Sequence, residues 1–126
     1  AIEGLLEKGS LVLLPPLGFS STGEVFDLDA SEVAQHAAVA LKADKLILLG
    51  ESEGLEDEQG ALLRQLSPFE AEPRLQQAVP GSELARHLNA ACTAAREGVA
   101  RTHLLSWRNH DQPISVQVMR EPLLAR

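Results

Sequence analysis

The stretch from residue 26 to residue 60, FDLDASEVAQHAAVALKADKLILLGESEGLEDEQG, decides the fold. An apolar entry around Val25, Phe26 and Leu28 leads into a Ser-led amphipathic run whose small apolar residues form one stripe. An apolar run over 45–49 follows at once and predicts a buried strand. Strand, helix and strand within about 35 residues are typical of a βαβ unit, which usually places ligands at the carboxyl ends of its strands.

Composition limits the classes of partner. The chain has 126 residues, few aromatic side chains and a net charge of −7, so a nucleic-acid surface built from basic groups and stacked rings is not expected. No apolar run approaches the roughly 20 residues that span a membrane, so no membrane partner is expected. Cys92 is the single cysteine, which excludes an internal disulfide and fits a cytoplasmic location. We expect one domain over 1–126.

Strands and helices alternate along the rest of the chain. Before the central stretch, the pattern predicts a short helix ending at Gly9, a buried strand over 11–14 and a Gly/Ser/Thr-rich loop over 15–24. After it, the pattern predicts a turn at 57–60, a short strand over 61–66, a helix from Ser67 and a helix from Ser82 to Gly98. A strand ending at Ser106 follows, and then a final strand over 114–118, for which an edge position is one option. Ser31 and Ser82 are expected N-caps. This order indicates an α/β fold with a largely parallel sheet flanked by helices.

Three polar segments leave alternatives open. The loop over 15–24 can offer backbone donors to an anion or can be a plain solvated turn. The acidic residues after the second strand, Glu51, Glu53, Glu56, Asp57 and Glu58, can hold Mg²⁺ with phosphate or can be a solvated loop. Asp27 and Asp29 share one side of an extended chain, where they can bind a substrate amine or hydroxyl or can simply be turn residues.

The titratable side chains give no metal motif. The four histidines, His36, His87, His103 and His110, show none of the spacings that are typical of a metal site, so we expect no metal. Cys92 falls on the apolar stripe of its predicted helix, which favours a packed thiol over a nucleophile.

Several ordered segments resemble the carboxyl-terminal half of the amino-acid-kinase fold. They are FDLDASE (26–32), LKADKLILL (41–49), the pattern Glu-x-Glu-Gly-Leu-x-Asp-x-x-Gly (51–60) and the run from Gly81 to Ser106. Within that fold the chain is most similar to the kinase-like domain of bacterial N-acetylglutamate synthases, which the loop PLGFSSTGEVF (16–26) also resembles.

The resemblance implies a cytoplasmic, homo-oligomeric protein of arginine biosynthesis. Its parent enzyme would transfer an acetyl group from acetyl-CoA to glutamate, with L-arginine as an allosteric effector. That acetyltransferase activity belongs to a separate domain, which nothing in this chain resembles, so the chain is expected to need no cofactor and to be inactive alone. The loop Gly50, Glu51, Ser52, Glu53 and Gly54 would lie on the nucleotide or effector side.

Departures from the resemblance separate a synthase from a kinase. The related kinases have asparagine where Asp27 and Asp29 stand, aspartate where Ser31 stands, and a phosphate-neutralising lysine at or near His87. Their loss removes the charge stabilisation that phosphoryl transfer requires, so we expect no catalytic residue here. The segment over 112–118 lacks the glycines of the family's arginine site, which argues against arginine binding by this chain. The alternatives are an acetylglutamate-kinase-like phosphotransferase and a decayed binding module.

Overall fold

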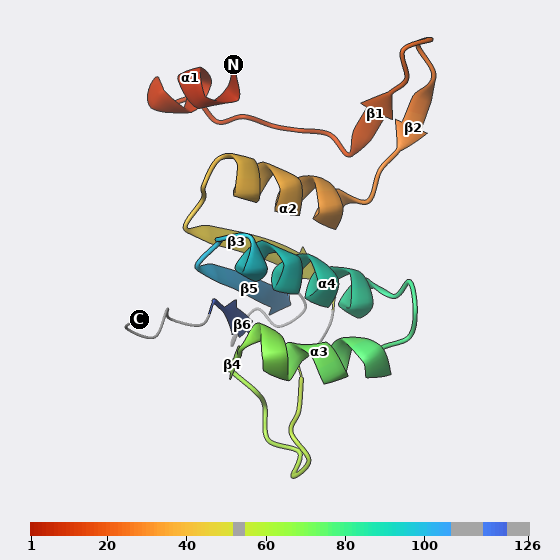
Figure 1. Cartoon of the computed structure of the whole chain (residues 1–126), viewed down its shortest axis with the longest axis vertical. Coiled ribbons are helices and arrows are strands. Elements are labelled where there is room, and N and C mark those ends of the chain that lie inside the picture. Colours follow the sequence, from red (N-terminus) through yellow and green to blue (C-terminus); the bar gives the residue numbers. More distant parts are fainter. Residues whose placement is uncertain (52–54, 107–114, 121–126) are drawn as a thin grey trace.

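The computed structural model describes residues 1–51, 55–106 and 115–120, and its main body is one sheet covered by three helices (Figure 1). In chain order the elements are α1 (Ile2–Glu7), β1 (Leu17–Phe19), β2 (Val25–Asp27), α2 (Ala30–Ala40), β3 (Lys45–Gly50), β4 (Gln65–Leu66), α3 (Pro68–Gln77), α4 (Glu83–Arg96), β5 (Arg101–Ser106) and β6 (Ser115–Met119). The predicted α/β class is confirmed.

The four-stranded sheet has the order β3-β5-β6-β4. The pairs β3–β5 and β4–β6 are parallel, whereas β5–β6 is antiparallel. The strand predicted over 114–118 therefore lies inside the sheet as β6, between β5 and β4, and not at an edge. Val116 and Val118 on this strand are fully buried, as an interior position requires.

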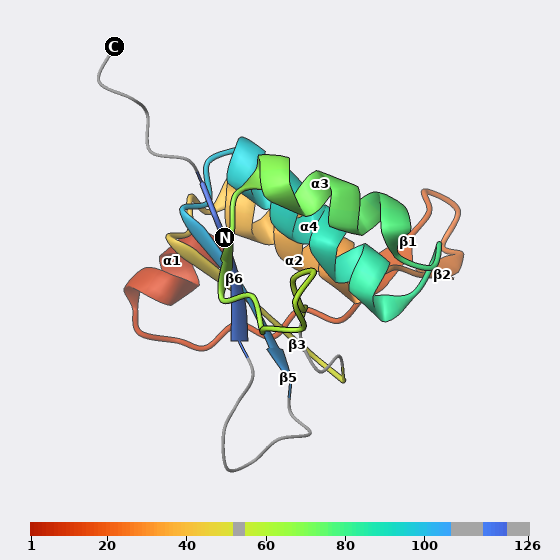
Figure 2. The same ribbon diagram turned by 90° about the horizontal axis from the view of Figure 1, so that it is seen from below.

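All three large helices cover the same face of the sheet (Figure 2). On β3 the side chains of Leu46 and Leu48 point to this face and are buried, whereas Ile47 and Leu49 point away from it and are exposed. Helix α4 lies centrally, and its alanines are among the most buried residues of the core: Ala90, Ala91, Ala94 and Ala95. Leu104 on β5 packs against all three clusters of buried side chains and joins them into one core.

The amino-terminal part of the chain differs from the expectation. Residues 11–14 form no strand, and Leu11 and Leu13 are almost fully exposed, because no strand of the described chain pairs with them. The predicted loop over 15–24 is instead most of a hairpin, in which β1 pairs with β2 antiparallel. Strand β2 therefore belongs to a separate two-stranded sheet, and the βαβ unit expected at 26–60 is wrong in its first strand.

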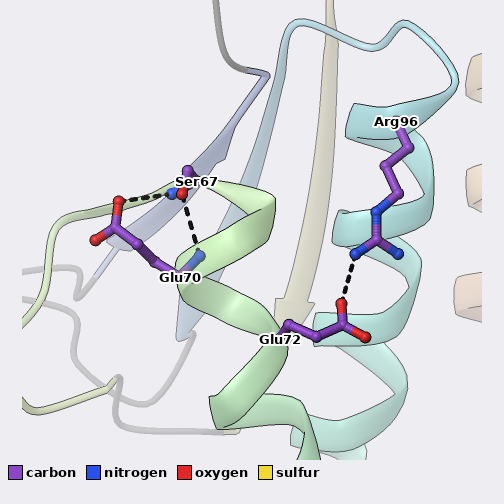
Figure 3. Close-up of polar contacts among 4 residues, drawn as sticks. All are labelled: Ser67, Glu70, Glu72 and Arg96. Atoms are coloured by element: carbon purple, nitrogen blue, oxygen red, sulfur yellow. Dashed lines mark hydrogen bonds and ion pairs between the residues drawn. The ribbon is translucent and has the colours of Figure 1, made fainter.

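Side-chain caps begin helices α2, α3 and α4, and Figure 3 shows the cap of α3. Ser67 begins α3 with a reciprocal pair of hydrogen bonds, since its Oγ accepts from the backbone N of Glu70 at 3.1 Å and Glu70 Oε1 accepts from the backbone N of Ser67 at 3.4 Å. Ser82 begins α4 as predicted. Ser31 does not begin α2: Asp29 is the N-cap, and its Oδ1 accepts from the backbone N of Ser31 at 3.1 Å. An Asp two residues earlier offers an equally good cap, so composition alone cannot choose between them.

Among the described residues, the helices are too short and too polar for any of them to cross a lipid bilayer.

The side chain of Thr102 at the centre of β5 supplies a test of this core. It is fully buried, and its Oγ1 has no hydrogen-bond partner among the residues that the structure describes. Thr102→Val keeps the shape and removes the unpaired hydroxyl, so the free energy of unfolding should rise by about 1 kcal/mol in urea denaturation. Thr102→Ser is the matched control: it keeps the hydroxyl, loses a methyl group and should lower stability by about 1 kcal/mol. A Val variant less stable than the wild type would contradict this account.

Candidate functional site

The carboxyl ends of β3 and β5 meet at one edge of the sheet, because these two strands are parallel and paired over their full length. Gly50 ends β3 directly opposite Ser106, which ends β5. The amino-terminal turn of α4 lies at the same edge, since Glu83 and His87 both approach Gly50. This edge is where α/β proteins usually bind ligands.

Gly50 allows α4 to approach the end of β3 closely. A methyl group at this position would collide with the carboxylate of Glu83 and would lie 3.0 Å from Cε1 of His87. The backbone N–H of the next residue, Glu51, donates to Glu83 Oε1 at 2.7 Å. The carboxylate of Glu83 therefore ties the loop that follows β3 to the start of α4.

His87 faces this contact from the next turn of α4. Partial burial is the main reason why the pKa of His87 is lowered from its ordinary value, and Arg86 lowers it further. The carboxylates of Glu83 and Asp29 act in the opposite direction but do not outweigh burial. The ring is consequently held in its neutral form more than an exposed histidine would be.

A hollow opens beside this group. Its accessible volume is only about 20 Å³, and it is lined by Gly50, Leu55, Leu84, His87, Leu104, Leu105 and Val116. Small-molecule sites usually measure roughly 300–1,000 Å³, so this hollow is a narrow crevice and not a preformed ligand pocket. Its lining is mainly apolar, and His87 is the single titratable side chain among the described residues that line it.

The structure brings only part of the predicted site together. Asp29 lies close enough to His87 for its charge to act on the ring. Ser31 is buried, and its Oγ donates to Asp29 Oδ1 at 2.8 Å, so the hydroxyl is engaged within the first turn of α2. Asp27 ends β2 and pairs with Leu17 in the hairpin. The two aspartates therefore belong to different elements, Asp27 to the hairpin and Asp29 to the cap of α2.

The acidic segment is only partly described. Ser52, Glu53 and Gly54 lie outside the described residues, as do 112–114 of the proposed arginine segment and His110. Asp57 shapes the predicted turn, since its Oδ1 accepts from the backbone N of Gln59 at 2.8 Å and of Ala61 at 2.9 Å. Within the part of the chain that is described, no three His, Cys, Asp or Glu side chains gather into a group able to hold a metal ion.

The loop over 15–24 uses its polar groups internally. The backbone N–H groups of Ser20 and Gly23 donate to carbonyls across the turn, and that of Glu24 donates to Ser20 Oγ at 3.0 Å. This arrangement agrees with the plain turn and leaves none of these three donors for an anion.

Two further residues complete the comparison with the sequence. Cys92 is buried, and burial raises the pKa of its thiol, as expected of a packed side chain and not of a nucleophile. Sequence reasoning missed Glu83, because a glutamate in the first turn of a helix is adequately explained by the helix dipole. The one feature that sets Glu83 apart is its close contact with Gly50, the glycine at the end of strand β3.

Comparison with known proteins gives this arrangement a context. The model of the amino acid kinase family matches residues 1–106. A protein of Pseudomonas syringae pv. tomato named amino-acid acetyltransferase is 48% identical over 106 residues, which cover 84% of this chain and 24% of that protein. The chain thus spans about a quarter of the length of this curated relative.

Solved structures show the same fold. N-acetylglutamate synthase from Neisseria gonorrhoeae, complexed with coenzyme A and N-acetyl-glutamate, is similar with a TM-score of 0.83 and 31% identity, over 96% of this chain and 30% of that one. The same enzyme complexed with coenzyme A and L-arginine gives a TM-score of 0.74 and 36% identity, over 83% of this chain and 24% of that one.

Substitution of Gly50 tests the close approach of α4. Gly50→Ala should lower the free energy of unfolding by about 1–3 kcal/mol, the usual cost of overpacking, because the new methyl group meets Glu83. The double variant Gly50→Ala with Glu83→Ala should recover part of that loss in a double-mutant cycle. Gly4→Ala is the control, since nothing lies within 4 Å of a methyl group there, and its effect should stay below about 1 kcal/mol. Equal effects at Gly4 and Gly50 would refute the contact.

The lowered pKa of His87 predicts a dependence of stability on pH. Because the folded pKa lies below the unfolded value of 6.5, the unfolded state binds more protons, and stability should fall as the pH drops through 6.5 toward the folded pKa. Urea midpoints at pH 7.5 and 5.5 should therefore differ less in His87→Gln than in the wild type. His36→Gln, at an exposed position on α2, is the control and should leave the difference unchanged. An unchanged difference in both variants would contradict the prediction.

Proposed function

This chain belongs to the amino acid kinase family, and on that premise we propose that it is the kinase-like, non-phosphorylating portion of an N-acetylglutamate synthase. The parent enzyme would transfer the acetyl group of acetyl-CoA to L-glutamate in the cytoplasm, as the first step of arginine biosynthesis. The likeness to an amino-acid acetyltransferase and to a synthase that binds coenzyme A and N-acetyl-glutamate supports the parent's identity.

The surroundings of His87 are the main support for the proposal that this portion transfers no phosphoryl group. Phosphoryl transfer requires positive charge near the transferred group. At this edge burial lowers the pKa of His87, which disfavours a positive charge on its ring, and the two carboxylates that act on it, Glu83 and Asp29, would repel a phosphate. Ser31, which replaces the aspartate of the kinases, already donates its hydroxyl to Asp29. None of these groups supplies what a kinase needs.

The role that remains is regulatory or structural within the parent. The synthase from N. gonorrhoeae has been solved with L-arginine, which supports arginine as an effector of the parent. The segment over 112–118 of this chain has no glycine, in contrast to the family's arginine site, so the effector role is assigned to the parent and not to this segment. Acetyl-CoA is likewise assigned as a substrate of the separate acetyltransferase domain, and the parent is expected to assemble as a homo-oligomer.

A phosphotransferase is the second candidate function, and one observation favours it. The hollow beside His87 lies at the carboxyl ends of β3 and β5, where a phosphotransferase of this fold would be expected to bind its nucleotide. Charge weighs against this candidate, because two carboxylates, Glu83 and Asp29, and only one cation, Arg86, act on His87, whose own pKa is lowered.

Assay of ATP turnover separates the two candidates. The chain incubated with ATP, Mg²⁺ and N-acetylglutamate should release no more ADP than a blank without protein, in a coupled assay that detects one turnover. The same result should hold for Gly4→Ala, which leaves the site untouched. ADP release that depends on N-acetylglutamate and disappears in His87→Ala would overturn the proposal in favour of the kinase.

A further inference from the structure

The ring of His87 closes the crevice at the carboxyl ends of β3 and β5. The accessible space beside it is about 20 Å³, room for about one water molecule. Gly50 has no side chain, and Cε1 of His87 would lie only 3.0 Å from a Cβ there, so the ring packs on bare backbone. The other side chains of the lining are aliphatic: Leu55, Leu84, Leu104, Leu105 and Val116.

A neutral ring suits this position better than a charged ring. The aliphatic side chains offer an imidazolium no hydrogen-bond acceptor, and partial burial is the main reason why the pKa of His87 is lowered. The charged groups of the described residues that act on the ring are Glu83 and Arg86 on its own helix and Asp29 at the cap of α2. The lining residues on β3, β5 and β6 carry no charge. A protonated ring is therefore better placed outside the crevice than within it.

The carboxylate of Glu83 is the acceptor nearest to such a ring. Glu83 precedes His87 by one turn of α4, so the two side chains lie on the same face of the helix. Glu83 Oε1 and His87 Cε1 both lie within 3.0 Å of the same point, the position that a Cβ of Gly50 would take. Among the charges that act on the ring, that of Glu83 has the largest effect.

Glu83 also holds the backbone at the end of β3. Its Oε1 accepts a hydrogen bond from the backbone N–H of Glu51 at 2.7 Å. That donor is neutral, whereas an imidazolium is charged, and hydrogen bonds become stronger when the partners carry charge. A protonated His87 therefore competes with the N–H of Glu51 for the same carboxylate.

We propose that His87 and Glu83 form a proton-operated latch on the end of β3. When the ring is neutral, it fills the crevice, and Glu83 holds the backbone of Glu51. When the ring is protonated, it leaves the crevice, pairs with Glu83 and draws the carboxylate away from Glu51. The latch uses contacts within this chain alone and does not depend on which of the two candidate functions is correct.

The direction of the pH dependence follows from the burial of the ring. The closed state binds the proton less tightly than an exposed histidine does, so the pKa of His87 lies below its ordinary value of 6.5. The open state binds the proton more tightly, and proton uptake shifts the population toward it. The latch is closed at neutral pH and opens as the pH falls through the pKa of His87 in the folded chain. Opening widens the apolar crevice at the edge of the sheet where α/β proteins usually bind ligands.

Nuclear magnetic resonance of the 126-residue chain between pH 7.5 and 5 tests the latch. The range stops at pH 5 because ordinary glutamates protonate near a pKa of about 4.3. As the ring of His87 titrates, its nuclear Overhauser contacts with the methyl groups of Leu84 and Leu105 should disappear. Over the same range the protection of the Glu51 amide from solvent exchange, corrected for the intrinsic effect of pH, should fall at least tenfold.

Two variants and one internal reference make the test specific. His87→Gln cannot take up a proton and should keep the Glu51 amide protected throughout. His36→Gln, at an exposed position on α2, is the matched control and should behave as the wild type does. The amide of Ala85 donates to Ser82 Oγ at 3.2 Å at the same end of α4, and its protection should stay unchanged.

Any one of three results would overturn the proposal. The first is a Glu51 amide that keeps its protection while His87 titrates. The second is a protonated ring that retains its contacts with the two leucines. The third is an equal loss of protection at Ala85, since the whole start of α4 would then open. The wild-type titration alone gives each of these answers if His87→Gln does not fold.

Discussion

The close packing of α4 on the sheet is the constraint on which the rest of the structure depends. The face of α4 that meets β5 and β6 consists largely of alanines, so its backbone lies nearer to the strands than a face of large side chains would allow. Helices α2 and α3 pack on either side of α4, and Leu104 lies beneath all three clusters. The same closeness brings the first turn of α4 against the end of β3, where it leaves no room for a side chain at residue 50.

This packing explains why the polar side chains of the candidate site serve the structure and are not presented to a ligand. Glu83 and His87 on α4 lie at the end of β3, and Asp29, the N-cap of α2, acts electrostatically on the ring of His87. The carboxylate of Glu83 accepts a hydrogen bond from the backbone N–H of Glu51, and that of Asp29 accepts one from the backbone N–H of Ser31 as the cap of α2. Both carboxylates are therefore engaged in holding a loop and a helix end in place.

The sequence predicted those elements whose signal is local. The buried strand at 45–49 and the helices beginning at Ser67 and Ser82 follow from periodicity and capping, and the structure has them at these places. Residues 11–14 were predicted as a strand and form none, and the strand at 25–27 was placed in the wrong sheet, because pairing depends on partners elsewhere in the fold, which a run of apolar residues cannot reveal. Glu83 escaped notice for a related reason: its contact with Glu51 joins residues 32 positions apart.

Strand β3 pairs only with β5 among the described strands, and this open edge affects how the chain behaves in solution. Its sequence, Lys45-Leu46-Ile47-Leu48-Leu49, combines high strand propensity with a single charge at one end, and lacks the proline or inward-facing lysine with which proteins usually protect such edges. Strands from different molecules could add to it one after another. Refolding at high concentration would then compete with a cross-β polymer whose growth rises steeply with protein concentration, and yield would depend on dilution more than on temperature.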